Sequence, residues 1–376
     1  MPAATSVTRL TNDVRVRAVF VPYVMSRAIV LLSLVLTRHV LRAASARPLP
    51  IQARLGLLGW DAAWYRDIAH YGYDGVPKVG LRFFPLFPML ARVVAGIPGV
   101  SPGLATLLVA NVCALAAGVL VFELAHREGR SIALASRAVW ILYLAPSAFV
   151  LVMGYAEATL MTATLVALLA LRSRQWWIAA AAGLVAGLTR PVGVLLVVPA
   201  LFEAWHARAA ITRRQLAGAI AALVAPAAGA GAYLAWAEHR TGDLLYPVSV
   251  QQISTSRGGW VDPFRAVWRA GRLAAHGGHL SAGIHVVTVV VLVGLIVVLW
   301  RRWPASFTAY AIAAVVVALS ANNLDSLERY ALSTVPLVLA AADITGGGTR
   351  ERVVLTALGA LLVGCTVLAF SGLLVP

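Results

Sequence analysis

Apolar stretches close to the length of a membrane-crossing helix recur along the whole of this chain. The hydrocarbon core of a bilayer is roughly 30 Å thick, and a helix of about 20 apolar residues crosses it. We therefore predict an all-α polytopic membrane protein with about eleven transmembrane helices. They are placed at residues 18–41, 103–126, 131–151, 155–172, 176–189, 191–206, 214–237, 283–301, 304–320, 329–343 and 351–373.

The low charge content supports this class. Hydrophobic residues make up 60% of the chain and charged residues only 12%, whereas about a quarter of a soluble domain is charged. Because the apolar stretches cover the whole length, residues 1–376 are predicted to form one integral membrane domain. Cys113 and Cys365 both fall inside predicted spans, which excludes a disulfide framework or a cysteine metal site.

The net charge of +16 is explained by membrane topology. Short cytoplasmic loops carry an excess of basic residues, so nucleic acid is not an expected partner. A cytoplasmic N-terminus leaves two long extracytoplasmic loops, at residues 42–102 and 238–282, in a multi-pass protein of the cell (plasma) membrane. In this orientation every short inner loop is basic. The basic residues of these loops are Arg127, Arg130, Arg137, Arg172, Arg174, Arg208, Arg213, Arg214, Arg301, Arg302, Arg350 and Arg352.

The first outer loop is also basic, although it lies on the opposite side. Long loops escape the charge rule, so this does not overturn the topology. A positive field at the outer surface favours an anionic lipid headgroup or a lipid phosphate, and simple adhesion to membrane lipids is the alternative. The basic residues of this loop are Arg42, Arg47, Arg54, Arg66, Lys78, Arg82 and Arg92.

The same loop contains the densest polar and aromatic cluster of the chain, at residues 60–74. Trp60, Trp64 and Ile68 recur every four positions, which predicts a short amphipathic helix over residues 59–71 in the membrane interface. One interpretation is an aromatic belt in which Asp61 only caps the helix. The other is that Asp61, a carboxylate at a lipid-water boundary, acts as a general base for a hydroxyl acceptor.

A second interfacial segment follows within the same loop. Residues 82–88 form an aromatic run that two prolines interrupt and that is too short to cross the membrane. The two interfacial segments are predicted to cover a groove embedded in the membrane.

These motifs resemble the PIG-V type mannosyltransferases of the GT-C glycosyltransferase superfamily. The resemblance is carried by Trp60-Asp61-x-x-Trp64-Tyr65-x-x-Ile68-Ala69-x-x-Gly72-Tyr73, by Phe83-Phe84-Pro85-Leu86-Phe87-Pro88, by Leu188-Thr189-Arg190-Pro191-x-Gly193 and, more weakly, by Arg329-Tyr330 with Pro336. The first of these stretches is the specific one.

The resemblance implies a GT-C-like enzyme of glycolipid or glycan biosynthesis. Such an enzyme takes a hexose, usually mannose, from a polyprenyl-phosphate sugar and passes it with inversion to a hydroxyl of a lipid or glycan acceptor. The family's presumed general base maps onto Asp61, and the acceptor of the eukaryotic members is not carried over to this chain. The alternative function is a polytopic transporter or flippase for lipids or sugars, in which ionisable residues near the midplane and repeated halves are expected.

Several residues are candidates for binding substrate. Arg190 and Arg329 could each hold the donor phosphate; the alternatives are snorkelling at a helix end for Arg190 and a local ion pair with Asp325 or Glu328 for Arg329. Glu157 either lines the same cavity or only interacts with the N-terminus of its helix. The remaining substrate-binding candidates are Trp60, Trp64, Tyr65 and Arg82.

The sequence predicts no metal site and identifies no cofactor. Asp67, Asp74 and His70 share the first outer loop with Asp61 but lack a recognised metal-ligand spacing, so a solvated polar face is the preferred interpretation. A divalent cation remains an alternative. Arg27 lies in the middle of the first predicted span and must have a partner or face a water-filled cavity.

Overall fold

The computed structural model describes residues 3–44, 48–252, 258–276 and 280–376. These residues form seventeen α-helices and five short 3-10 helices, and none of them belongs to a β-strand. Arg47 and Arg257, from the two long outer loops, lie outside the described residues. In chain order the elements are α1 (Ala3–Ala44), α2 (Ile51–Leu55), η1 (Gly56–Leu58), α3 (Asp61–Tyr71), η2 (Lys78–Arg82), α4 (Leu86–Ala95), α5 (Pro102–Arg127), α6 (Ile132–Leu144), η3 (Ala148–Leu151), α7 (Glu157–Arg172), α8 (Trp176–Thr189), η4 (Pro191–Leu196), α9 (Val197–Ala207), α10 (Arg213–Thr241), α11 (Tyr246–Ser249), η5 (Val250–Gln252), α12 (Pro263–Ala275), α13 (Leu280–Arg302), α14 (Ala305–Leu319), α15 (Leu327–Ser333), α16 (Val335–Thr345) and α17 (Thr349–Phe370).

Within the described ranges, five helices are long and apolar enough to cross a membrane, which is consistent with a multi-pass membrane protein. They are Arg15–Ala44 within α1, Pro102–Arg127, Arg213–Thr241, Ala282–Arg302 within α13 and Thr349–Phe370. The other predicted spans also fall on helices, but these helices are shorter, so the structure leaves the number of eleven as a prediction.

Two predicted spans are broken, because each contains a segment that cannot continue an α-helix. In the span predicted at residues 131–151, α6 ends at Leu144 and a turn at Pro146 leads into η3. In the span predicted at residues 329–343, the backbone leaves the helical conformation at Thr334, between α15 and α16. Pro336 is the second residue of α16. Proline lacks the amide that an uninterrupted helix would need at these positions.

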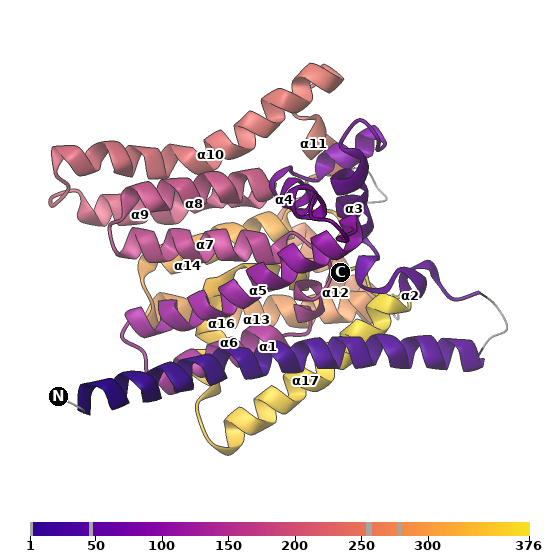
Figure 1. Cartoon of the computed structure of the whole chain (residues 1–376), viewed down its shortest axis with the longest axis horizontal. Helices are drawn as coiled ribbons and strands as arrows, with labels where there is room; N and C mark the ends of the chain where they lie inside the picture. Colours follow the sequence, from indigo (N-terminus) through magenta and orange to yellow (C-terminus); the bar gives the residue numbers. More distant parts are fainter. Residues whose placement is uncertain (1–2, 45–47, 253–257, 277–279) are drawn as a thin grey trace.

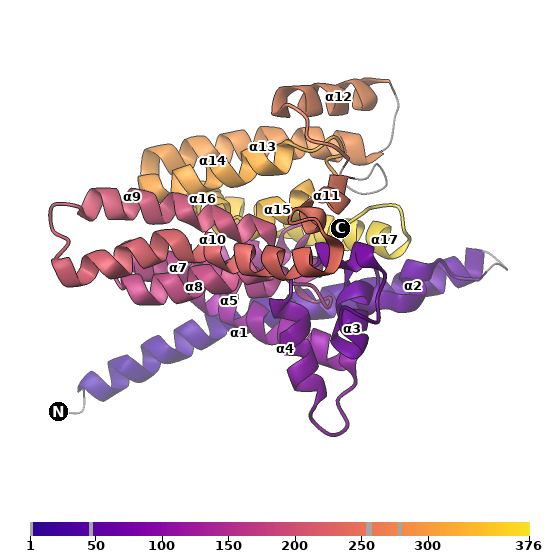
Figure 2. The same cartoon turned by 90° about the horizontal axis from the view of Figure 1, so that it is seen from above.

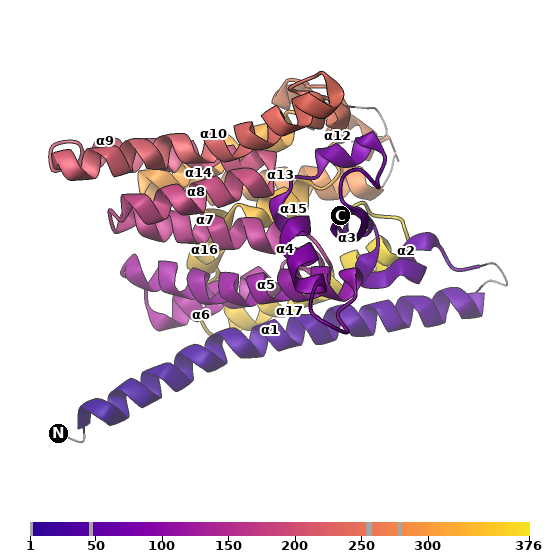
Figure 3. The same cartoon turned by 45° about the horizontal axis from the view of Figure 1, so that its top comes forward.

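The long helices run side by side along one direction, with the N-terminus at one end of the bundle and α3 at the other (Figure 1). Seen from above, α12 and α13 lie on one side of the bundle and α1 on the other (Figure 2). The first helix follows the edge of the bundle (Figure 3), where it packs against α6 and α17. The N-terminus and α3 thus lie at opposite ends of the bundle, and the predicted orientation, with a cytoplasmic N-terminus, would put α3 at the extracytoplasmic end.

Small residues bring α8 and α10 into close contact. A Cβ atom on Gly187 would lie 2.1 Å from the carbonyl oxygen of Pro226, so only glycine fits at this crossing. Helices in membranes commonly approach one another through such small residues. Pro226 lies within α10, and the second half of that helix is inclined to the first (Figure 1), as expected at an internal proline.

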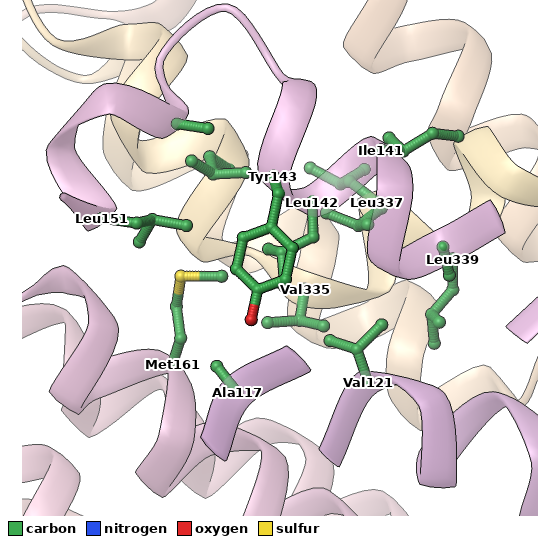
Figure 4. Close-up of a cluster of buried hydrophobic side chains, with 14 of the residues drawn as sticks. Ala117, Val121, Ile141, Leu142, Tyr143, Leu151, Met161, Val335, Leu337 and Leu339 are labelled. Carbon is green, nitrogen blue, oxygen red and sulfur yellow. The ribbon is translucent and has the colours of Figure 1, made fainter. Parts of the chain in front are cut away.

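The core of the bundle is apolar and tightly packed. Tyr143 is fully buried among Ala117, Leu142 and Met161 (Figure 4), and its hydroxyl donates a hydrogen bond of 2.8 Å to the carbonyl of Ala114. A buried phenol needs such a partner because an unpaired hydroxyl is costly in an apolar environment.

The partner that Arg27 requires is supplied by α5 and by the segment after α6. Its guanidinium donates to the Asn111 side-chain oxygen at 3.1 Å and to the Leu151 carbonyl at 2.9 Å, and it lies 3.7 Å from the centre of the Tyr23 ring. Arg27 thus ties α1 to the bundle, and these contacts give the mid-span charge a structural role.

Candidate functional site

A cavity of about 470 Å³ opens at the end of the bundle where α3 lies. Its walls come from the two long loops at residues 42–102 and 238–282, from the junction between α8 and η4, from α14 and α15 with the segment between them, and from the C-terminal residues. Segments far apart in the sequence therefore meet at one place. The lining residues are Trp60, Asp61, Tyr65, Arg82, Phe83, Phe84, Tyr155, Arg190, Pro191, Val192, Leu195, Val248, Gln251, Trp260, Val317, Asp325, Ser326, Arg329, Tyr330, Val375 and Pro376.

The short helix predicted at residues 59–71 exists, but it begins two residues later than expected, at Asp61. Trp60 precedes the helix with a φ of 55°, a left-handed conformation that is uncommon outside glycine. Two contacts hold it: its amide donates to the Gln52 side-chain oxygen at 2.9 Å, and its indole N–H donates to the Ala369 carbonyl at 3.0 Å. Trp60 therefore orients the start of α3 against α17, and the prediction of a helical stripe beginning at Trp60 is wrong.

Asp61 is held at the first position of α3 with its carboxylate in the cavity. Its Oδ2 lies 2.7 Å from Nη1 of Arg329, its Oδ1 lies 3.8 Å from Nη2 of Arg82, and its amide donates to the Tyr155 hydroxyl at 3.2 Å. Trp60, not Asp61, occupies the N-cap position of α3, and the carboxylate of Asp61 forms ion pairs with Arg329 and Arg82, so a helix cap alone does not explain Asp61. The side chain remains 26% exposed, so a small hydroxyl can reach it from the cavity.

The charges around Asp61 decide its protonation. Burial acts to raise the pKa of this carboxyl, but the positive charges of Arg329 and Arg82, together with the hydrogen bond from Arg329, outweigh it. The pKa of Asp61 is therefore held below its usual value, and the group is a carboxylate at neutral pH.

Arg190 and Arg329 converge on one buried carboxylate, Glu157. Arg190 forms an ion pair with Glu157 and donates to the Tyr330 hydroxyl at 3.3 Å, while Nε of Arg329 lies 3.3 Å from Glu157 Oε1. The Arg190 and Arg329 side chains are 13% and 9% exposed, and that of Glu157 only 1%. Both arginines also line the cavity.

These contacts correct three expectations from the sequence. Arg190 does not snorkel at a helix end, because it points inward to Glu157. Arg329 pairs with Asp61 and Glu157, and its expected ion pair with Asp325 or Glu328 is not among the ion pairs found in the described part of the chain. Glu157 does stand at the first position of α7, but the two arginines are its ion-pair partners, so an interaction with the helix N-terminus alone does not explain it.

Aromatic side chains form one wall of the cavity. Tyr65 packs edge-on against Phe83, with ring centroids 5.0 Å apart, and burial raises the pKa of Tyr65 to about 12. Its hydroxyl therefore stays protonated and can donate a hydrogen bond. Trp64 is the one predicted substrate-binding residue that does not line the cavity; it stacks on Phe83, with ring centroids 5.8 Å apart.

A cluster of one buried histidine and two carboxylates lies beside the cavity, and the sequence did not predict it. His285 lies 3.0 Å from Glu328 Oε1 and 3.7 Å from Asp325 Oδ1, and Thr288 donates to the same Glu328 oxygen at 2.9 Å. Asp325 lines the cavity, and Asn323 donates to its carboxylate at 2.6 Å. The only sequence signal was a single histidine at the start of an otherwise apolar span.

The remaining acidic side chains of residues 42–102 lie in ion pairs and do not line the cavity. Asp67 pairs with Arg66 at 2.8 Å, and Asp74 pairs with Arg240 from the end of α10. Among the residues described, no group of three or more His, Cys, Asp or Glu side chains is arranged to hold a metal ion. At Asp61 the neighbouring guanidinium groups disfavour a divalent cation, because like charges repel at short range.

A scan against models of protein families and a search of curated proteins each gave no match to this chain. What the site can do therefore follows from its own geometry. An ionised carboxylate accessible from a cavity can accept a proton, and three arginines in the same cavity can bind an anion and stabilise developing negative charge.

Proposed function

We propose that this protein is a membrane glycosyltransferase. In this proposal it moves a hexose, mannose in the first instance, from a polyprenyl-phosphate sugar to a hydroxyl of a lipid or glycan acceptor on the extracytoplasmic face, with inversion. The observation that supports it best is the presence of Asp61 and of Arg82, Arg190 and Arg329 in the wall of one cavity.

The chemistry of the transfer needs one base, and Asp61 fits that role. The acceptor oxygen attacks the anomeric carbon, the bond from that carbon to the phosphate oxygen breaks, and the acceptor proton passes to Asp61. A single displacement of this kind inverts the anomeric centre. The partial exposure of Asp61 and its ionised state at neutral pH support this assignment.

The three arginines fit the leaving group. A phosphodiester donor carries one negative charge, and the departing polyprenyl phosphate carries up to two at neutral pH. Cations placed where charge develops lower the barrier to reaction. The guanidinium groups are planar and donate paired hydrogen bonds to phosphate oxygens, so Arg82, Arg190 and Arg329 can stabilise the phosphate as its charge grows.

The apolar part of the cavity fits a lipid-linked donor. Phe84, Val192, Leu195 and Val317 line it together with the charged residues. A long prenyl chain partitions into apolar surroundings while its phosphate stays with the arginines. The cavity thus combines a lipid-compatible surface with a polar reacting centre, as a substrate of this class requires.

The proposal is tested with Asp61→Asn, which preserves the size of the side chain. We expect this variant to insert and to keep its melting temperature within a few degrees, but to lose transfer of radiolabelled mannose from polyprenyl-phosphate mannose to membrane acceptors. Asp67→Asn is the matched control, because Asp67 lies on the same helix and pairs with Arg66 outside the cavity. Full transfer by Asp61→Asn would remove Asp61 from the mechanism.

The same preparation separates the transferase from a transporter or flippase. Purified protein in vesicles is given labelled donor lipid and an extract of acceptor lipids, and the products are separated by chromatography. A labelled acceptor supports the transferase, whereas movement of intact donor between leaflets with no labelled acceptor supports the transporter.

A further inference from the structure

Glu157 occupies an unusual position beside the cavity. Its side chain is 1% exposed and does not line the cavity, yet it contacts two arginines that do. A buried carboxylate is costly unless cations compensate its charge, and two guanidinium groups in contact keep it ionised. Glu157 therefore cannot touch a substrate directly, but it is placed to control the groups that would.

Five side chains make up this group, which we name the arginine-carboxylate cluster: Asp61, Arg82, Glu157, Arg190 and Arg329. Three of them are cations and two are anions, so the cluster carries one positive charge. Without Glu157 it would carry two. Asp325 and His285 also lie near the cavity. Replacing Glu157 with a neutral residue changes the local charge by one unit, whether His285 is protonated or not.

Contacts within the cluster also fix the geometry of the arginines. Glu157 Oε1 is shared between Arg190 and Arg329, so one carboxylate holds both guanidinium groups at the cavity wall. The other ends of these groups contact Tyr330 and Ser326, at 3.3 Å and 3.1 Å. Arginines fixed in this way lose little side-chain entropy when they bind an anion.

We propose that Glu157 is a positioning and specificity-determining residue, which pairs Arg190 with Arg329 and limits the positive charge of the cavity so that it prefers a singly charged phosphodiester over a doubly charged phosphomonoester. This inference rests on the proposed function, in which the donor is a phosphodiester and the released product is a phosphomonoester. A cavity matched to one negative charge binds the donor and releases the product.

The test measures binding rather than turnover. The probes are methyl dodecyl phosphate, an unreactive phosphodiester, and dodecyl phosphate, the phosphomonoester with the same chain. Each is titrated calorimetrically into purified full-length protein in non-ionic micelles at pH 8. The quantity of interest is how the ratio of the two dissociation constants changes between wild type and variant at one pH, because the partition of each probe into micelles is the same for both proteins and cancels in that comparison.

For Glu157→Gln we expect the ratio at pH 8 to shift towards the phosphomonoester by roughly tenfold, as one additional positive charge near the phosphate predicts. At pH 5 the phosphomonoester is mostly singly charged, since its second pKa is about 6. The shift should then largely disappear. If Glu157 had a purely structural role, Glu157→Gln would weaken the binding of both probes by the same factor and leave the ratio unchanged at either pH.

A second pair of variants covers the case in which Glu157→Gln does not fold. Arg190→Gln removes a positive charge, and we expect the ratio to move towards the phosphodiester. The double variant Glu157→Gln with Arg190→Gln removes the buried ion pair as a unit and restores the cluster charge, so its ratio should return to within about threefold of the wild-type value. Size-exclusion chromatography and thermal melting identify which variants are folded.

The outcomes are distinguishable. If the wild-type protein binds neither probe, the proposed function fails and this inference fails with it. If the wild-type protein binds the probes but the ratio stays the same in Glu157→Gln, or in the double variant relative to Arg190→Gln, only the inference about Glu157 is overturned.

Discussion

Replacing Asp61 with asparagine should strengthen the binding of an unreactive phosphodiester while it abolishes transfer. In the structure Arg329 is engaged by Asp61 at 2.7 Å, and Arg82 lies 3.8 Å from the same carboxylate. A phosphate that binds these arginines must therefore compete with Asp61. Asparagine keeps the shape of the side chain but removes the competing charge.

The magnitude follows from the contact and its exposure. Two unit charges about 4 Å apart attract by about 4 kcal/mol at an effective dielectric constant near 20. Asp61 is 26% exposed, so water already screens part of this attraction, and we reduce the net value to about 1–2 kcal/mol. The expected gain in affinity is then roughly 5- to 30-fold.

The assay is calorimetric titration of wild-type, Asp61→Asn and Asp67→Asn proteins with methyl dodecyl phosphate at pH 8, at low and high salt. Asp67→Asn should bind as the wild type does, since Asp67 pairs with Arg66 away from the cavity. Added salt should reduce the gain, because it screens the partly exposed charges. Equal or weaker binding by Asp61→Asn would refute the idea that the carboxylate and the phosphate compete for the same arginines.

Two further predictions concern pH and packing. The pKa of Asp61 is lowered in the folded protein, so the stability that this group contributes is present above its unfolded pKa of about 4 and is lost as the pH falls through the folded value. Transfer measured from pH 8 down to pH 5 should therefore show no loss that Asp61 causes. A base-limb pKa near 6 that appears in the wild type and persists in Asp67→Asn would contradict this. Gly187→Ala should destabilise the protein by about 1–3 kcal/mol, because the new Cβ would lie 2.1 Å from the Pro226 carbonyl oxygen. The control is Gly231→Ala, whose Cβ meets nothing within 4 Å. Thermal melting should show no comparable loss of stability for this control.

Much of the helical framework was predictable from the sequence, because hydrophobic length alone marks a membrane helix. The predicted spans at residues 103–126 and 214–237 match α5 and α10 to within a few residues. The breaks near Pro146 and Pro336 were not predicted, since the apolar run continues through each of them. Apolar length gives the extent of a hydrophobic segment but does not report where its backbone leaves the helical conformation.

The members of the candidate site were easier to predict than their pairing. Asp61, Arg190 and Arg329 stood out because each is a charge near apolar surroundings. Their contacts could not be predicted, because the partners are remote in sequence: Asp61 and Arg329 are 268 residues apart. Glu157 was noticed without its arginines, and His285 was not noticed at all, because a single polar residue in an apolar helix gives no indication of what it faces.

The hydrogen bond from Trp60 to Ala369 has a consequence for how the protein is made. It joins residues 309 positions apart, and with it the backbone that orients Asp61 is fastened to α17. The chain around Trp60 is synthesised long before α17 is translated, so this hydrogen bond cannot form until α17 has been made. The backbone that orients Asp61 is thus fastened only after α17 has been made, so shorter nascent chains lack this contact beside the cavity.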